Sequence, residues 1–240
     1  MSHYCEKARW ALNRAGVPFT EEKHLQGFHY LYTYRYARSA FVPIFVTEEA
    51  LLRESSDILE WADGKMSASE KIYPEDANQK KAVKEFVRTL DEVFGPAGRL
   101  WMYTYMFNFP DVLLEYSIKH GVPALESRMM PFMFPLFRSF ARRRLKWGGT
   151  SRTDSKLCVD RVFAQVASKL ENGQRFLFGE KFSAADLTFA ALAAPVILPE
   201  LYGVVLPKLD ELPREMAEQV MVWREHIAGK FALRLYQEHR

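Results

Sequence analysis

The sequence has few cysteines, little net charge and no long uninterrupted apolar run. Its 240 residues include two cysteines, Cys5 and Cys158, too few for a scaffold held together by disulfides. The net charge is +3, from 33 basic and 30 acidic residues, so we expect no nucleic-acid partner. The stretch 187–207 has one charged residue, Glu200, but prolines interrupt it and its apolar part is too short to cross a bilayer.

Several catalytic classes also leave no signature in this sequence. Its 6 histidines show no metal-ligand spacing with the cysteines, so no metal is expected. Neither a glycine-rich phosphate loop nor a Ser-His-Asp pattern is found. The chain does not open with a secretion signal, so we predict an intracellular, cytoplasmic protein. What the sequence does contain is ample aromatic surface for a buried core, with 18 Phe, 11 Tyr and 5 Trp.

The first 65 residues mix helical and strand patterns. Apolar spacing predicts a helix over 4–15, ended by Gly16. Strand-forming residues predict a strand over 19–25 and a hairpin formed by 41–46 and 51–53. A helix follows, capped by the polar residues at 55–57. Residues 1–65 are therefore expected to form an α/β domain.

The rest of the chain shows almost only helical periodicity. Small and polar residues at 66–76 predict a linker, and residues 77–240 are expected to form an all-α helical-bundle domain. The helices are expected near 77–107, 111–120, 124–146, 154–172, 184–198 and 213–228.

Four short motifs occur in order along the chain. They are Ser2-His3-Tyr4-Cys5 before the first helix, Val42-Pro43 in a strand, Glu54-Ser55 at a helix start, and the segment 179–187, Gly-Glu-Lys-Phe-Ser-Ala-Ala-Asp-Leu. Together they resemble the serine-type members of the cytosolic glutathione transferases. The resemblance covers most of the chain and is weakest in the middle. It implies a thioredoxin-like domain followed by an all-helical domain, without metal or prosthetic group and with glutathione as co-substrate.

The resemblance gives each motif of the first domain a role in binding glutathione. It implies that Ser2 donates a hydrogen bond to the glutathione thiolate, where the dipole of the first helix also favours an anion. It implies a cis Val42–Pro43 bond that presents backbone groups to glutathione, and binding of the γ-glutamyl end by Glu54 and Ser55. The alternatives are a disordered terminal serine or a simple helix cap at Ser2, a trans proline at a strand edge, and a capped surface helix at Glu54.

In the second domain the resemblance implies a structural motif and a pocket. Ser183 and Asp186 have the spacing of a capping box, whose role is structural. The electrophile pocket is expected at the start of the helical domain, although ordinary core packing would use the same residues. The aromatic residues there are Trp101, Tyr103, Tyr105 and Phe107.

The chain also departs from the family pattern. The strand that precedes the Ser-x-x-Cys segment in the family is missing, so the thioredoxin-like domain is expected to be N-terminally truncated. An additional segment near 110–147 combines an apolar run with a basic cluster, formed by Arg138, Arg142, Arg143, Arg144 and Lys146. It could touch a membrane surface. We favour a helix that faces the core and ends in cations, which suit the helix dipole.

These observations lead to one main hypothesis and two alternatives. The main hypothesis is a dimeric, cytoplasmic transferase with a detoxification role, which joins the glutathione thiolate at Ser2 to an apolar electrophile. The first alternative is a non-catalytic binding or interaction module of the same architecture, which could associate with a membrane surface. The second is thiol-disulfide exchange through Cys5, although a cysteine on the inner face of a first helix is more often packed as a small apolar residue.

Overall fold

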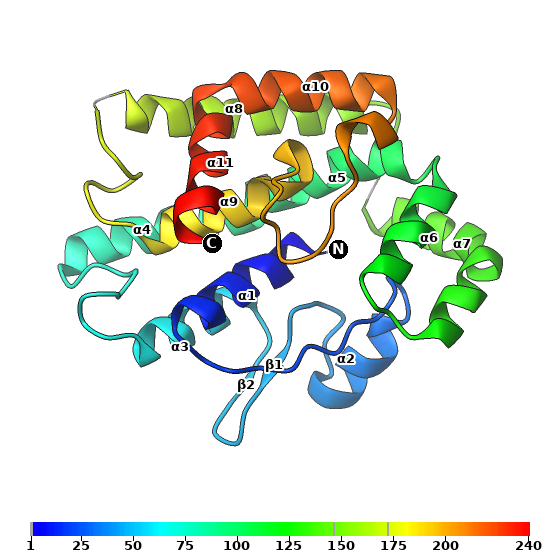
Figure 1. The fold of residues 1–240 in the computed structure, drawn as a ribbon, viewed down its shortest axis with the longest axis horizontal. Helices are drawn as coiled ribbons and strands as arrows, with labels where there is room; N and C mark the ends of the chain where they lie inside the picture. The colour runs from blue at the N-terminus through cyan, green and yellow to red at the C-terminus, as the bar shows by residue number, and fades with distance from the viewer. Residues whose placement is uncertain (1, 146, 172) are drawn as a thin grey trace.

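The structure, a computed structural model, describes residues 2–145, 147–171 and 173–240. Figure 1 shows the hairpin, α2 and α3 on one side of the molecule, α8 and α10 on the other side, and α6 and α7 at one end. The elements are α1 (His3–Arg14), α2 (His29–Ala37), β1 (Phe45–Val46), β2 (Leu51–Leu52), α3 (Ser55–Lys65), α4 (Ala77–Thr89), the π-helical turn η1 (Leu90–Phe94), α5 (Gly95–Met106), α6 (Pro110–Lys119), α7 (Ala124–Arg144), α8 (Ser151–Leu170), α9 (Ala184–Ile197), the 3₁₀ turn η2 (Leu209–Glu211), α10 (Arg214–Glu225) and α11 (Ile227–His239).

Helix α9 is the centre of the hydrophobic core. Its sequence is apolar on every side, and all of its residues are buried, as expected for a helix that has no solvent-facing side. It contacts α1, α4, α5, α10 and α11. At its start, Asp186 accepts hydrogen bonds from the backbone N–H groups of Ser183 and Leu177, each at 2.8 Å. The expected capping box is confirmed.

Helix α1 joins the two parts of the chain. It contacts α3 in the first 65 residues and α9 in the helical part, and it crosses the middle of the molecule in Figure 1. Trp10 is almost completely buried, and its indole N–H donates to the backbone carbonyl of His239 at 2.9 Å. The position of α1 therefore depends on residues from both ends of the sequence.

The first 65 residues have a smaller sheet than the sequence indicates. The expected hairpin is confirmed as β1 and β2, an antiparallel pair with Phe45 opposite Leu52. The strand expected over 19–25 is wrong, because this segment has neither strand nor helix structure and is not paired with any described strand. A strand needs a neighbour to bond its backbone groups, and no described strand is hydrogen-bonded to this segment. Helix α2, in turn, was not expected.

The helical part follows the expected periodicity with small shifts in the boundaries. The helix expected near 77–107 is observed as α4, η1 and α5, a helical run that contains one π-helical turn. The helix expected near 213–228 ends earlier, at Glu225, and α11 follows it as a separate helix. Residues 66–76 form neither helix nor strand between α3 and α4. Within the described residues, no helix has both the length and the apolar character needed to span a bilayer.

Helix α7 is apolar on more than its inner side. Met130, Phe134 and Ala141 form a second core with Tyr103 of α5 and Phe107, the residue that follows α5. The opposite side is exposed and also apolar, with Leu125, Met129, Phe132, Met133, Leu136 and Phe140. The helix therefore faces the core as expected, but it also presents an apolar surface to solvent. Of the basic cluster, Lys146 and the side chain of Arg144 lie outside the described residues.

Candidate functional site

A single cleft of about 1590 Å³ brings together most of the residues that the motifs single out. It is lined by the first turns of α1 and α3, the segment 17–26, the segment before β1, and one side of α5. Among the expected site residues, those on its walls are Ser2, Val42, Pro43, Glu54, Ser55, Tyr103 and Phe107. Two helix N-termini thus border one cleft, and each offers unpaired backbone N–H groups to an anion.

Ser2 caps α1 at the cleft. Its Oγ accepts a hydrogen bond from the backbone N–H of Cys5 at 3.4 Å, and its backbone is extended. A serine hydroxyl has one proton to donate and two lone pairs to accept. Capping uses only a lone pair, so the hydroxyl proton remains available to a ligand in the cleft. Ser2 can therefore cap the helix and donate a hydrogen bond to a thiolate at the same time.

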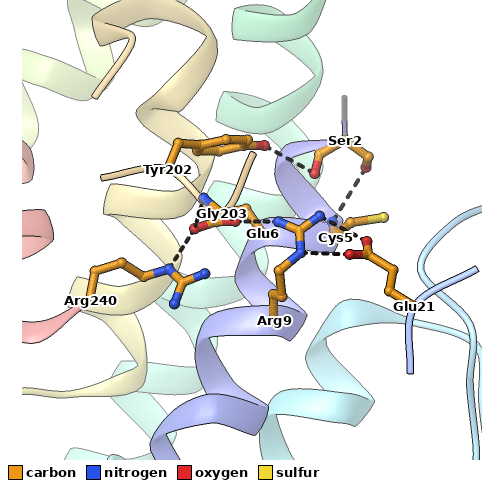
Figure 2. A network of polar contacts seen from close by, with 8 residues as sticks. All are labelled: Ser2, Cys5, Glu6, Arg9, Glu21, Tyr202, Gly203 and Arg240. Carbon is orange, nitrogen blue, oxygen red and sulfur yellow. Dashed lines mark hydrogen bonds and ion pairs between the residues drawn. The ribbon is translucent and has the colours of Figure 1, made fainter. Parts of the chain in front are cut away.

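A network of charged groups fixes the start of α1 (Figure 2). The carboxylate of Glu6 is fully buried; Arg9 donates to it, and so does Arg240 at 2.7 Å. The backbone N–H of Gly203 also donates to this carboxylate, at 3.2 Å. The hydroxyl of Tyr202 donates to the backbone carbonyl of Ser2 at 3.2 Å. These contacts hold the first turn of α1 in place from the helical side.

The other glutathione-binding candidates lie on the first part of the chain. The Val42–Pro43 bond is cis, as the resemblance implies. Ser55 is buried in the first turn of α3, and Glu54 precedes it as the N-cap residue, without a side-chain hydrogen bond to the helix. Partial burial and the carboxylates of Asp57 and Asp91 raise the pKa of Glu54. Glu54 is therefore a carboxylate that a ligand cation would stabilise.

A cluster around the buried Lys7 was not found from the sequence. The ammonium group of Lys7 has no exposed side-chain surface and donates to Asp91 at 2.7 Å and to Ser56 at 2.8 Å. Ser56 in turn donates to Asp91 at 2.6 Å. The cluster joins α1, α3 and η1, and it fixes the relative positions of the two helix N-termini. Lys7 and Asp91 are 84 positions apart in the sequence, so no local pattern reveals the pair.

Only half of the expected electrophile pocket lines the cleft. Tyr103 and Phe107 lie on its wall and stack with ring centroids 4.6 Å apart. Trp101 and Tyr105 are not among the lining residues. Trp101 packs against Trp223 in the core at 4.5 Å, and the guanidinium of Arg152 covers Tyr105 at 3.8 Å. Helical geometry explains the difference, because residues four apart share one side of α5 and residues two apart do not.

The alternative of thiol-disulfide exchange through Cys5 gains no support from the surroundings of the thiol. Burial raises the pKa of the Cys5 thiol, although its contact with Ser2 acts in the opposite direction. A thiol with a raised pKa is mostly protonated at neutral pH and is a poor nucleophile. Among the described residues, no three His, Cys, Asp or Glu side chains are grouped so that they could hold a metal ion.

Comparison with known proteins identifies the family. Residues 1–70 match the family model of the glutathione S-transferase N-terminal domain, and residues 126–230 match that of the C-terminal domain. The two matches together take in well over half of the chain. A comparison with curated protein sequences gives no match.

Solved structures of transferases share the fold at low sequence identity. A glutathione S-transferase from Xanthobacter autotrophicus Py2 is 15% identical, with a TM-score of 0.60 over 99% of this chain and 89% of that chain. A glutathione transferase from Burkholderia graminis, with two glutathione molecules bound per subunit, is 15% identical, with a TM-score of 0.60 over 97% and 79%. Glutathione transferase F2 from Populus trichocarpa is 14% identical, with a TM-score of 0.54 over 98% and 95%. The chain, a thioredoxin-like domain with a small sheet followed by a helical domain, belongs to the glutathione S-transferase family.

Proposed function

We propose that this transferase binds glutathione in the cleft, activates its thiol at Ser2 and adds the thiolate to an electrophile held against α5. The observation that carries the proposal is that the N-termini of α1 and α3 border the same cleft. Two of the anionic groups of glutathione can match them, the thiolate and the carboxylate of its γ-glutamyl end. Helix N-termini and hydroxyl groups favour such anions over their protonated forms.

The residues of the cleft divide the work between the two ends of glutathione. The hydroxyl of Ser2 donates to the sulfur and, with the dipole of α1, lowers the pKa of a thiol that is about 8.5 in free cysteine. Ser55 and the backbone at the start of α3 bind the γ-glutamyl carboxylate, and Glu54 binds the neighbouring ammonium group. Val42 and Pro43 present backbone groups to the cysteinyl part. The thiolate then attacks an electrophile positioned against Tyr103 and Phe107.

Calorimetric titration of glutathione into the 240-residue chain tests this proposal. We expect one glutathione molecule to bind per chain, and Glu54→Ala to weaken binding about tenfold, since it removes one charge-assisted contact. The matched control is Glu48→Ala, which removes an exposed carboxylate that does not line the cleft. A folded chain that releases no heat with glutathione, or equal losses in both variants, would contradict the proposal.

A second function is suggested by the apolar surface of α7. Phe132 is 86% exposed and Leu136 is 67% exposed, which is unusual for side chains without a partner. Arg142 and Arg143 follow at the end of the same helix. An apolar surface next to cations suits the surface of an anionic membrane.

Sedimentation with liposomes that contain an anionic lipid tests this second function. Binding should decrease in a Phe132→Ser/Leu136→Ser variant, and it should decrease with salt and in an Arg142→Gln/Arg143→Gln variant. Liposomes without anionic lipid are the control. Equal sedimentation of the three proteins would leave the transferase as the only supported function.

A further inference from the structure

One side of α5 runs from the start of α1 into the cleft. Gly95, Arg99, Tyr103 and Phe107 follow one another at intervals of four residues and therefore share a side of the helix. At Gly95 this side touches the first turn of α1, since a Cβ atom there would lie 2.5 Å from the hydroxyl of Tyr4. Arg99, Tyr103 and Phe107 then line the cleft. Arg99 is thus one turn away from the helix that carries Ser2.

Arg99 has no counter-ion in the described part of the chain. Its Nε atom is buried without a hydrogen-bond partner, and none of its nitrogen atoms forms an ion pair with a described carboxylate. The other cations near this end of α1 are paired, Lys7 with Asp91 and Arg9 with Glu6. A partly buried cation without a partner is costly unless something else supplies the negative charge.

The positive charge of Arg99 shifts the pKa values of neighbouring side chains. Burial is the main cause of the low pKa of the His3 imidazole, which is about 3, and the charge of Arg99 is the second largest cause. It also opposes the rise that burial causes in the pKa values of Tyr4 and Tyr103. His3 is therefore neutral at physiological pH and does not compete with Arg99 for an anion. Arg99 therefore brings to the cleft a positive charge that no described ion pair neutralises.

Beyond Arg99 the wall of the cleft is aromatic. Tyr103 and Phe107 stack with an angle of 18° between their rings, and Phe137 from α7 meets Phe107 edge-on at 5.7 Å. The Tyr103 hydroxyl, to which Gln26 donates at 2.5 Å, is a polar group on this wall. A ligand that fits this arrangement has a flat apolar body and an anionic group at one end.

We propose that Arg99 binds a carboxylate of the electrophile, so that the preferred substrates are aromatic electrophiles with a carboxylate group. The planar guanidinium can bind a carboxylate with two parallel hydrogen bonds, which a neutral ester cannot match. The inference rests on the proposed transfer of glutathione to an electrophile. Arg99 acts as a specificity-determining residue, because it orients the aromatic ring beside the sulfur.

A matched pair of aryl chlorides tests the inference, 4-chloro-3,5-dinitrobenzoate and its methyl ester. In both reactions the thiolate sulfur forms a bond to the ring carbon that carries chlorine, the C–Cl bond breaks, and chloride leaves with the bonding electrons. The thiol proton goes to solvent. The measured quantity is the ratio of kcat/KM for the acid to kcat/KM for the ester, which cancels general effects of a variant on glutathione binding.

We expect Arg99→Gln to lower this ratio by about ten- to hundredfold, and Arg99→Lys to lower it less, because lysine keeps the charge but not the planar fork. The control is Arg88→Gln, which removes an exposed cation from the rim of the same cleft and should change the ratio less than twofold. Arg99→Gln should also leave the midpoint of urea unfolding unchanged or higher, whereas a structural role for Arg99 would lower it.

The other outcomes separate this inference from the proposed function. An unchanged ratio in an active Arg99→Gln variant overturns the inference alone. A higher KM for glutathione with an unchanged ratio also overturns it, because Arg99 would then bind a carboxylate of glutathione. If glutathione does not bind at all, the proposed function fails. Calorimetry with 3,5-dinitrobenzoate and its methyl ester then decides whether Arg99 forms an anion site. Tighter binding of the acid than of the ester, lost in Arg99→Gln, supports the anion site. Equal binding of acid and ester overturns it.

Discussion

The hydroxyl group of Ser2 lies where the dipole of α1 meets the cleft. It accepts from the backbone N–H of Cys5, and the carbonyl of the same serine is held by Tyr202. The backbone at Ser2 is thus fixed by a contact that does not involve its side chain. Removal of the hydroxyl should therefore affect the ligand more than the position of the helix.

We predict that Ser2→Ala raises the apparent pKa of the bound glutathione thiol by about one unit, because one hydrogen bond to a charged group is lost. The ultraviolet absorbance of the thiolate, followed against pH, measures this change. Ser2→Thr keeps a hydroxyl at the same position and should restore a lower pKa. If the alanine variant titrates like the original protein, Ser2 is a helix cap only.

His3 gives the fold a specific dependence on pH. Burial, followed by the charge of Arg99, lowers the pKa of His3 from 6.5 to about 3. Below about pH 6.5 the unfolded chain binds a proton that the folded chain does not bind, so the free energy of unfolding falls as the pH decreases toward 3. The slope is at most about 1.4 kcal/mol per pH unit.

We predict that the contribution of His3 to this slope disappears in His3→Phe, because the phenyl ring fills the site without titrating. Urea unfolding of both proteins between pH 4 and pH 7, in steps of about half a unit, measures it. The quantity to compare is the difference in unfolding free energy between the two proteins at each pH. Burial raises the pKa of Asp186 to about 6, which gives both proteins a slope opposite to that of His3. Parallel curves for the two proteins would show that His3 is not neutral in the fold.

The residues of the site could be predicted from the sequence only where a local motif carries them. Ser2, Pro43, Glu54 and Ser55 each belong to a short motif, and the structure places all four on one cleft. Arg99 could not be predicted in this way, because its proposed role depends on the lack of a counter-ion among the described residues and on contact between α1 and α5. Both are properties of packing and leave no trace in the spacing of residues.

At the scale of single elements, helices and a hairpin that carry local signals were predictable, and the state of the segment 19–25 was not. Helix α9 combines a capping box with an apolar run, and both signals belong to the helix itself. The segment 19–25 has strand-forming residues, but strand structure also requires a neighbour that the segment alone cannot specify. The tyrosine-rich segment of α2 shows the reverse, since residues with strand preference are helical there.

The start of α9 should be one of the most sensitive points of the fold. We predict that Ser183→Ala lowers the free energy of unfolding by about 0.5–2 kcal/mol, the usual cost of a lost cap. Asp186→Ala should cost more, because it also leaves the buried N–H of Leu177 without an acceptor. Chemical denaturation measures both values. Glutathione affinity per folded molecule should stay unchanged, and a loss of binding in the folded variants would contradict a purely structural role.

At the scale of the whole molecule, the two parts of the chain are linked through α1. The Glu6 carboxylate binds arginines from α1 and from the last position of the sequence, and it also accepts from the loop that follows α9. Trp10 adds a contact to the end of α11. Because one helix packs against both parts, neither part can lose its structure without exposing buried surface of the other.

We therefore predict that the chain unfolds in one cooperative transition and that Glu6→Ala shifts it. The substitution removes a buried carboxylate between two arginines, which should lower the free energy of unfolding by about 3–5 kcal/mol. The control is Lys230→Ala, which removes an exposed ion pair with Glu225 and should cost less than about 1 kcal/mol. Far-ultraviolet circular dichroism and tryptophan fluorescence should give the same urea midpoint in each protein. Two separate midpoints would show that the parts fold independently, and α1 would then not be the link that places Ser2 in the cleft.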